Sequence, residues 1–372
     1  MTASLLYAWI RSAAPPAAAF SSIYVPVTNI PKADLSLRPE FSTVLHYGGL
    51  KPSDLITLDD LNPVGRSTLD PEASKWVLVD HNFLQGLLGK VYDQRVGGVI
   101  DHHEDEHRTP IDTGCEPRII EKAASCTSLV TEFVRKSWDN ISASTTEGSQ
   151  ELNAEMAKMA ISSILIDSVC LKDSGKVTSH DKEAALYLET KIRAAAHPGE
   201  EYDRQKLHGE VYNAKQDITH LCLNDILRKD YKEWEENGKK LGISTVVKSL
   251  QFLVDKADQE RNPATEDAIS KSLDEFCDHR QLDVYGIMTA FTDDYDGFKK
   301  ELFLRSMHSA SDATIERFQN AATEELGLSG WKGPKLSFGK STQQVVWQQN
   351  QIQHTRKRIA PLLRGAMSFK GQ

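Results

Sequence analysis

Two short apolar runs in the first third of the chain each end in an aspartate. One run is Val77–Asp80 and the other is Val96–Asp101. Between them, apolar side chains recur at i, i+3, i+4, i+7 and i+8, the spacing of one helix face. These side chains are Leu84, Leu87, Leu88, Val91 and Tyr92. Because apolar runs this short suit buried strands, the pattern predicts a strand–helix–strand unit.

This unit predicts that the two aspartates lie close together. Strands joined by a helix are parallel with a right-handed crossover, so Asp80 and Asp101 should leave the same edge of one sheet. Asp101 is followed by His102 and His103, and both rings can turn toward that edge if the chain leaves the strand there. Carboxylates bind hard cations, and imidazoles suit manganese, iron, cobalt or zinc. The sequence therefore predicts a divalent-metal site, although a single aspartate after an apolar run is more often a strand end or a helix cap.

The rest of the chain predicts a second domain. From Thr219 onward, strand and helix patterns alternate. The expected strands cover 241–247, 282–291, 301–305 and 345–348, and the expected helices cover 250–262 and 319–327. We predict an α/β fold with an N-terminal parallel-sheet domain over residues 1–190, a linker over 191–217, and a smaller C-terminal α/β domain with a mixed sheet over 218–368.

The composition of the chain argues against nucleic-acid and membrane partners. The chain carries 44 lysines and arginines against 53 aspartates and glutamates, a net charge of −9, which argues against broad nucleic-acid binding. No uninterrupted apolar segment reaches the roughly 18 residues of a membrane span. The 5 cysteines show no C-x-x-C spacing, and their odd number suits reduced thiols. These features predict a cytoplasmic protein with no nucleic-acid or membrane partner. We also expect a monomer, although composition does not determine the oligomeric state.

Several motifs resemble those of a known family. Asp80-His81-Asn82 and Asp101-His102-His103 resemble the second and third motifs of the DHH phosphoesterases, which include family II inorganic pyrophosphatases, exopolyphosphatases and single-strand exonucleases. Ala124–Leu129 resembles the hydroxyl-rich helix start after the third motif, and Ile164–Ser168 resembles the fourth motif. Thr355–Arg358 resembles the basic substrate clamp of the second, DHHA2 domain. The segments that look most like fungal exopolyphosphatase are 29–38, 115–118 and 225–232.

The resemblance implies roles for individual residues. Asp80 and Asp167 would bridge two divalent ions, Mn²⁺ or Mg²⁺, and His102 would bind one of them. The implied catalytic residues are His103, which would contact substrate, and Asp101, which would orient the neighbouring histidine. The implied substrate-binding residues are Asn82, Ser128, Arg356 and Lys357. Arginine offers phosphate oxygens a bidentate fork, and lysine offers a compact charge.

One family motif is absent from this sequence. The family pattern opens with a strand and an Asp-x-Asp-Ser motif whose two aspartates complete the metal sites, whereas Met1–Ala8 resembles the helix that follows that motif. Under the family pattern, one metal site would keep three protein ligands and the other would keep two. We expect a truncated or mis-started chain rather than a protein that evolved without the motif.

The resemblance also implies hydrolysis of a phosphoanhydride. We expect metal-dependent release of terminal phosphate from inorganic polyphosphate, impaired by the missing motif. One alternative is hydrolysis of pyrophosphate or of a nucleotide phosphodiester by the same residues, because motifs that hold metal do not measure the length of the substrate. Another alternative is a non-catalytic remnant that binds metal or polyphosphate.

Overall fold

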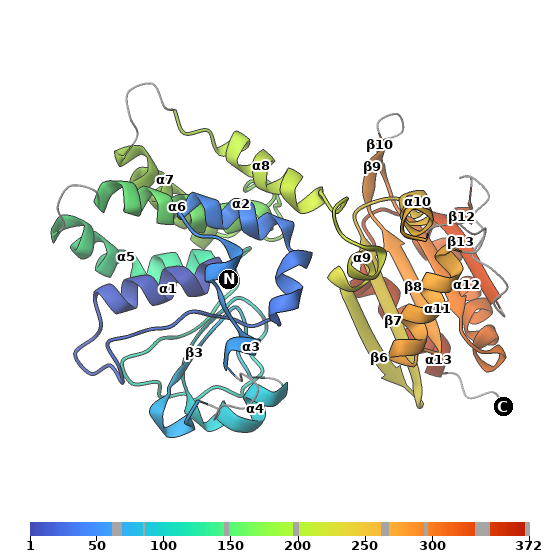
Figure 1. The fold of residues 1–372 in the computed structure, drawn as a ribbon, viewed down its shortest axis with the longest axis horizontal. Helices are drawn as coiled ribbons and strands as arrows, with labels where there is room; N and C mark the ends of the chain where they lie inside the picture. The colour runs from blue at the N-terminus through green and yellow to red at the C-terminus, as the bar shows by residue number, and fades with distance from the viewer. Residues whose placement is uncertain are drawn as a thin grey trace. The chain divides into compact units, whose positions relative to one another are not determined.

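The chain folds into two compact units, Met1–Asp217 and Ile218–Gln372 (Figure 1). The computed structural model describes residues 1–61, 69–84, 86–144, 149–195, 201–261, 268–293, 297–331 and 343–368. None of the helices in those ranges combines the length and the apolar character that crossing a lipid bilayer requires.

A three-stranded parallel sheet lies at the centre of the first unit. Its strands are β3 (Trp76–Val79), β4 (Val96–Asp101) and β5 (Arg118–Ile120), in that spatial order, and β1 (Val27–Thr28) and β2 (Ile56–Thr57) form a separate parallel pair. The helices are α1 (Thr2–Ala13), α2 (Pro39–Tyr47), α3 (Leu58–Leu61), α4 (Gly86–Tyr92), α5 (Cys126–Ser144), α6 (Ser149–Asp167), α7 (Ser179–Ala194) and α8 (Arg204–Gln216). Short 3₁₀ turns cover Lys32–Leu37, Pro52–Asp54, Pro71–Ala73 and Asp93–Arg95.

Helices cover both faces of this sheet. Val99 of β4 packs with Leu88 and Tyr92 of α4 in a small core. The next residue, Ile100, packs in the larger core formed by α1, α2, α5, α6, α7 and α8, because successive strand residues face opposite sides. Figure 1 shows α4 and α5 on opposite sides of the sheet. This is the strand–helix–strand unit that the apolar pattern predicts, with a helix that begins only at Gly86.

The second unit contains a six-stranded sheet. The sheet is mixed, as the sequence analysis predicts. Its strands are β6 (Tyr231–Glu236), β7 (Lys239–Val246), β8 (Val284–Thr289), β11 (Glu301–Ser306), β12 (Leu328–Gly330) and β13 (Gln343–Gln349). They lie in the order β12-β13-β11-β8-β7-β6, and only β7 and β8 pair in parallel. A separate hairpin joins β9 (Phe291–Asp293) to β10 (Gly297–Lys299).

Helices also cover both faces of this second sheet. They are α9 (Leu223–Lys229), α10 (Leu250–Glu260), α11 (Ala268–Arg280), α12 (Asp312–Leu326) and α13 (Arg356–Ser368), with a 3₁₀ turn at Ser309–Ser311. Tyr285 and Ile287 of β8 face the core shared with α9, α10 and α11. Val284 and Met288 face the core shared with α12 and α13. Helices α9, α10 and α11 therefore lie on one face of the sheet, and α13, which begins at Arg356, lies on the other.

A buried carboxylate links α1 to the segment before β5. Glu116 accepts hydrogen bonds from the hydroxyls of Tyr7 and Tyr24, and it pairs with the Arg11 guanidinium at 2.8 Å. Only 4% of the Glu116 side chain and 9% of the Arg11 side chain are exposed. Burial and the hydrogen bond to Glu116 raise the pKa of Tyr24 to about 12, so this tyrosine remains a donor at neutral pH.

Replacing Glu116 with alanine should lower the free energy of unfolding of the first unit by about 3 kcal/mol or more, because the Arg11 charge stays buried without its partner. The matched control is Glu72→Ala, which removes an 82% exposed carboxylate paired with Arg95 and should cost about 1 kcal/mol or less. Urea unfolding followed by circular dichroism measures both variants, and equal losses would contradict this account.

Candidate metal centre

The site forms where β3 and β4 end. In the register of these two strands Val79 pairs with Ile100, and the Asp80 amide donates to the Ile100 carbonyl at 3.0 Å. Asp80 follows the last residue of β3, and Asp101 is the last residue of β4. Parallel pairing therefore brings the two carboxylates to one edge of the sheet.

Four side chains converge at this edge. Asp80, Asp101, His102 and His103 each offer one ligand atom, and these atoms lie within 4.8 Å of one another. His102 Nε2 lies 3.1 Å from Asp80 Oδ1, and His103 Nδ1 lies 2.8 Å from Asp101 Oδ1. Carboxylate oxygen and imidazole nitrogen together form a donor set that suits a divalent first-row metal. The residues present therefore fit a divalent cation.

The backbone at Asp80 is bent for this arrangement. Its φ of 70° lies in the left-handed region, which non-glycine residues rarely adopt and which costs about 1–3 kcal/mol. The bend takes the chain out of the β3 direction immediately after Val79, and the ring of His81 folds back so that its Nδ1 lies 3.0 Å from the Val79 carbonyl oxygen. Strain of this kind persists where the surrounding structure requires it, and it is concentrated at functional sites.

The charges of Asp80 and His102 favour each other. Burial disfavours the charged imidazolium, but hydrogen bonds to Asp80 and to the Ala123 carbonyl outweigh it and raise the pKa of His102 to about 9. Burial also disfavours the Asp80 carboxylate, yet the hydrogen bond from His102 and the positive amino group of Met1 hold the pKa of Asp80 below its usual range. The positive groups around Asp80 therefore keep its carboxylate ionised.

The buried Asp101 side chain contacts both histidines. It is fully buried, accepts the His102 amide at 2.8 Å through Oδ1, and contacts the His103 ring through the same oxygen. Its Oδ2 accepts a hydrogen bond from Asn82 Nδ2 at 2.6 Å. The side chain of Asn82 also binds the Glu104 carbonyl and the Glu106 amide at 2.9 Å each. Asn82 therefore fixes both Asp101 and the loop that follows the histidines.

Asp167, the last residue of α6, lies outside this cluster of four but interacts electrostatically with Asp80 and His102. Burial raises the pKa of Asp167 and the charge of Asp80 adds to the rise, while a hydrogen bond from Ser125 and the charges of Lys215 and His102 oppose it. Directly after Ser168, the three residues 169–171 all have positive φ, between 52° and 63°. This strained turn ends the helix at the carboxylate and directs the chain away from it.

The predicted substrate-binding residue Ser128 is buried and already has a partner. Its hydroxyl donates to Asp181 Oδ1 at 2.7 Å. Asp181 also accepts the backbone amides of Ala124 and Ser125, and it caps α7 through Thr178. Asp181 thereby fixes the start of α5 beside the metal centre. Our sequence analysis missed Asp181, although the capping-box spacing Thr178-x-x-Asp181 could have identified it.

The predicted basic residues Arg356 and Lys357 lie in the second unit, in the first turn of α13. Arg356 pairs with Asp230 Oδ1 at 2.7 Å, and it donates to the Asp230 carbonyl at 2.7 Å. Lys357 is exposed. The next residue, Arg358, pairs with Glu325. The structure therefore presents one cation of this segment to solvent and holds two in ion pairs.

Comparison with known proteins identifies the second unit. The model of the DHHA2 domain matches residues 209–366. A Schizosaccharomyces pombe protein named "Putative exopolyphosphatase" is 25% identical over 341 residues, which cover 92% of this chain and 82% of that protein. The human protein "Exopolyphosphatase PRUNE1" is 26% identical over 356 residues, 93% of this chain and 68% of that protein. The second unit therefore carries a DHHA2 domain, and nearly the whole chain is similar to proteins named exopolyphosphatases.

The chain is also similar to two further proteins. A Bacillus anthracis protein named "Probable manganese-dependent inorganic pyrophosphatase" is 28% identical over 199 residues, which cover 52% of this chain and 56% of that protein. A solved Methanococcus jannaschii structure, titled a putative family II inorganic pyrophosphatase, is 20% identical with a TM-score of 0.47 and 88% coverage of each chain.

Replacing Asp101 with asparagine should weaken Mn²⁺ binding about 10- to 100-fold, the usual cost of losing a carboxylate that orients metal ligands. Asparagine keeps the size of the side chain but removes the charge that holds the His103 ring. Glu106→Gln is the matched control, because its exposed carboxylate lies outside the cluster of four. Calorimetric titration with Mn²⁺ measures both, and unchanged affinity in the Asp101 variant would refute its role.

His180 should make the first unit depend on pH. Its ring bridges Glu132 at 2.7 Å and Glu121 at 3.2 Å, and the hydrogen bond to Glu132 raises the pKa of His180. Because the folded-state pKa exceeds the unfolded value of about 6.5, this stabilisation is complete below that value and is lost as pH rises through the folded-state pKa.

His180→Gln should therefore lower the melting temperature more at about pH 5.5 than at about pH 9. Thermal melts at the two pH values give the comparison. His46→Gln, which changes an exposed histidine on α2, should show no such difference, and a loss in the His180 variant that is the same at both pH values would contradict the bridge.

Proposed function

We propose that this chain is a divalent-metal hydrolase that releases terminal phosphate from inorganic polyphosphate. The observation that carries the proposal is the convergence of Asp80, Asp101, His102 and His103 at the ends of β3 and β4. The names of the relatives support it, since the yeast and human proteins are named exopolyphosphatases. The manganese dependence in the name of the Bacillus relative supports Mn²⁺ as the cofactor, with Mg²⁺ as the alternative.

The metal ligands we propose are Asp80, His102 and Asp167. Asp80 and His102 are already in contact at 3.1 Å, and Asp167 is near enough for its pKa to respond to both. Bound ions would activate a water molecule and offset the charge of the phosphoryl oxygens. The His102 ring is held by the Ala123 carbonyl at its Nδ1, 2.9 Å away, which leaves Nε2 as the nitrogen directed at Asp80 and the metal.

His103 is the residue we propose to contact substrate. Its Nδ1 is held by Asp101, and 62% of its side chain is exposed, so Nε2 faces solvent and can meet a phosphate oxygen. Asp101 accepts the proton on Nδ1 and fixes the ring orientation, so a second proton taken up by the ring lies on Nε2, from which it can pass to the leaving phosphate. Asp101 itself is fully buried and acts through the histidines.

We propose that Asn82 and Ser128 position the site rather than contact substrate. Both side chains are buried, and their polar atoms bind Asp101 and Asp181, respectively. Direct substrate contact would require each to give up those partners. Arg356 and Lys357 are the proposed phosphate-binding cations. Lys357 is exposed for this role, whereas Arg356 would have to share its guanidinium with Asp230.

Pyrophosphate hydrolysis is the second candidate. It is favoured by the Bacillus relative, whose name describes an inorganic pyrophosphatase. The same ligands would serve both substrates, because both reactions break one phosphoanhydride bond.

We also propose that the protein acts in the cytoplasm as a monomer. All five cysteines are free thiols, which suits a reducing compartment. The net charge of −9 supports the proposal that the protein does not bind nucleic acid.

The test is phosphate release from polyphosphate and from pyrophosphate with Mn²⁺ or Mg²⁺. Wild type should release orthophosphate from polyphosphate, and Asp80→Asn should reduce the rate at least about 100-fold, because it removes a proposed ligand. Asp112→Asn, a change in an exposed loop, is the matched control and should be unaffected. Release from pyrophosphate alone would favour the second candidate, and no release from either substrate would refute the proposal.

A further inference from the structure

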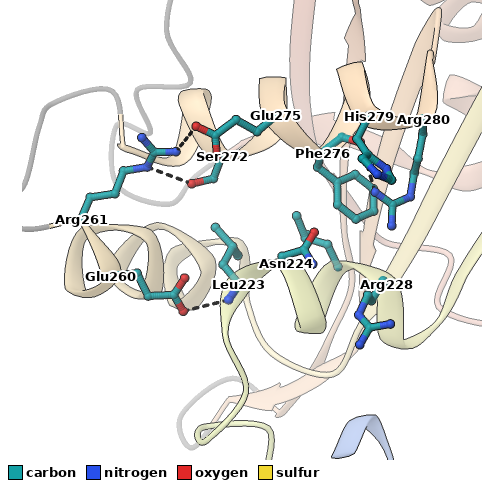
Figure 2. Close-up of a pocket in the computed structure, with 11 residues that line it drawn as sticks. Leu223, Asn224, Arg228, Glu260, Arg261, Ser272, Glu275, Phe276, His279 and Arg280 are labelled. Atoms are coloured by element: carbon teal, nitrogen blue, oxygen red, sulfur yellow. Dashed lines mark hydrogen bonds and ion pairs between the residues drawn. The ribbon is translucent and has the colours of Figure 1, made fainter. Parts of the chain in front are cut away.

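The second unit contains a cavity that the proposed function does not use. It has a volume of about 620 Å³ and lies between α9, the end of α10, and α11 (Figure 2). This volume is within the range of cavities that bind small organic ligands. Because α13 packs on the other face of the sheet, the cavity is separate from Arg356 and Lys357.

One end of the cavity is polar but neutralised. Arg261 donates to Glu275 Oε1 at 2.7 Å and to the Ser272 hydroxyl at 3.2 Å. Glu260 accepts the backbone amide of Leu223 at 2.8 Å, which caps the start of α9, and its charge is balanced by Lys256 at 3.9 Å. Figure 2 shows these groups together on one side of the cavity. This end has no unbalanced charge, and it offers hydrogen-bonding groups to a neutral polar ligand.

The opposite end is cationic. The guanidinium carbon of Arg280 lies 3.7 Å from the centroid of the Phe276 ring. Its Nη1 donates to the Phe276 carbonyl at 3.2 Å, and no carboxylate in the described ranges lies within ion-pair distance of it. Figure 2 shows His279 beside Arg280 on α11, with Arg228 of α9 across from them. Arg228 pairs with Asp225 at 2.8 Å, so Arg280 supplies the positive charge at this end, and the exposed His279 ring adds a hydrogen-bonding group beside it.

The ring face beneath Arg280 fixes the direction of its donors. A guanidinium stacked on an aromatic ring is held in one plane, and its fork matches the oxygens of a phosphate. The floor between the two ends is apolar and is formed by Leu223, Leu227 and Phe276. An inorganic phosphate or a phosphate chain would leave this floor and the neutral end unused. A ligand with a phosphate at one end and a flat ring carrying polar groups at the other would use all three.

We propose that this cavity binds a nucleoside phosphate, with its phosphate held by His279 and Arg280 and its base over the apolar floor toward Ser272. The proposal is independent of the function proposed for the metal centre. Arg280 is the last residue of α11, where a cation also stabilises the helix end. The experiment must therefore separate binding from stability.

The full chain is titrated with ADP in a calorimeter, with EDTA present so that the metal centre binds no ion. ADP should bind at one saturable site. Adenosine and orthophosphate, titrated separately, should each bind at least about tenfold more weakly, since each uses one part of the cavity. Tripolyphosphate should also bind more weakly than ADP, because it cannot use the apolar floor. Absence of ADP binding, or tripolyphosphate binding as tight as ADP binding, would overturn the proposal.

Variants then test the residues. Arg280→Met keeps an apolar stem over Phe276 and should weaken ADP binding about tenfold or more, because a charge-assisted bidentate contact is lost. His279→Gln, a change at an exposed position, should also weaken ADP binding. This variant replaces Arg280→Met as the test if Arg280→Met lowers the melting temperature. Lys271→Met removes a cation from the exposed side of α11 and should not affect binding. Unchanged affinity in both the Arg280 and His279 variants, with normal melting, would overturn the assignment.

Discussion

The structure of the metal centre depends on the parallel pairing of β3 with β4. Because their register sets Val79 beside Ile100, the first residue after one strand and the last residue of the other meet at one edge of the sheet. An antiparallel pair would place the two carboxylates at opposite edges. The short helix α4 between the strands is what makes the parallel pairing possible, and its apolar face is the reason that the crossover packs on the sheet.

Three buried carboxylates fix the segments that surround the candidate metal centre. Asp101 binds the histidine segment, Asp181 binds the start of α5, and Glu116 binds α1. Each is a charged group in a buried position, and each is surrounded by donors, as the cost of burying charge requires. The bends at Asp80 and at 169–171 store strain that these contacts balance. These contacts hold the four side chains of the candidate metal centre within 4.8 Å of one another.

Much of this arrangement could be predicted from the sequence. The apolar runs and the helix between them predicted that Asp80 and Asp101 would meet, because periodicity and the handedness of the crossover determine which edge they share. The resemblance, not the pattern, suggested Asp167, since nothing in a helical segment shows that its last carboxylate reaches a strand edge. Strand β6 was missed because its alternating charged residues, such as Glu233 and Glu235, lie on the exposed edge of the sheet.

The partners of buried polar groups could not be predicted. The contact between Ser128 and Asp181 spans 53 residues, and that between Arg356 and Asp230 spans 126. A linear pattern records which residues are polar but not which of them become neighbours after folding. Such contacts decide whether a side chain is free to meet a substrate, and for this reason the roles of Asn82 and Ser128 changed from substrate binding to positioning in our proposal. Arg356 and Asp230 are likewise brought together only by the fold of the second unit, where the start of α13 meets the residue before β6.

The most direct measurement is the position of manganese in crystals of this protein grown with Mn²⁺, located by its anomalous scattering. Our account predicts anomalous density in contact with Asp80 and His102 at the ends of β3 and β4, with Asp167 turned toward it. Well-ordered crystals with no anomalous density there, or with manganese bound only at other carboxylates, would contradict the claim that these strand ends form a metal centre.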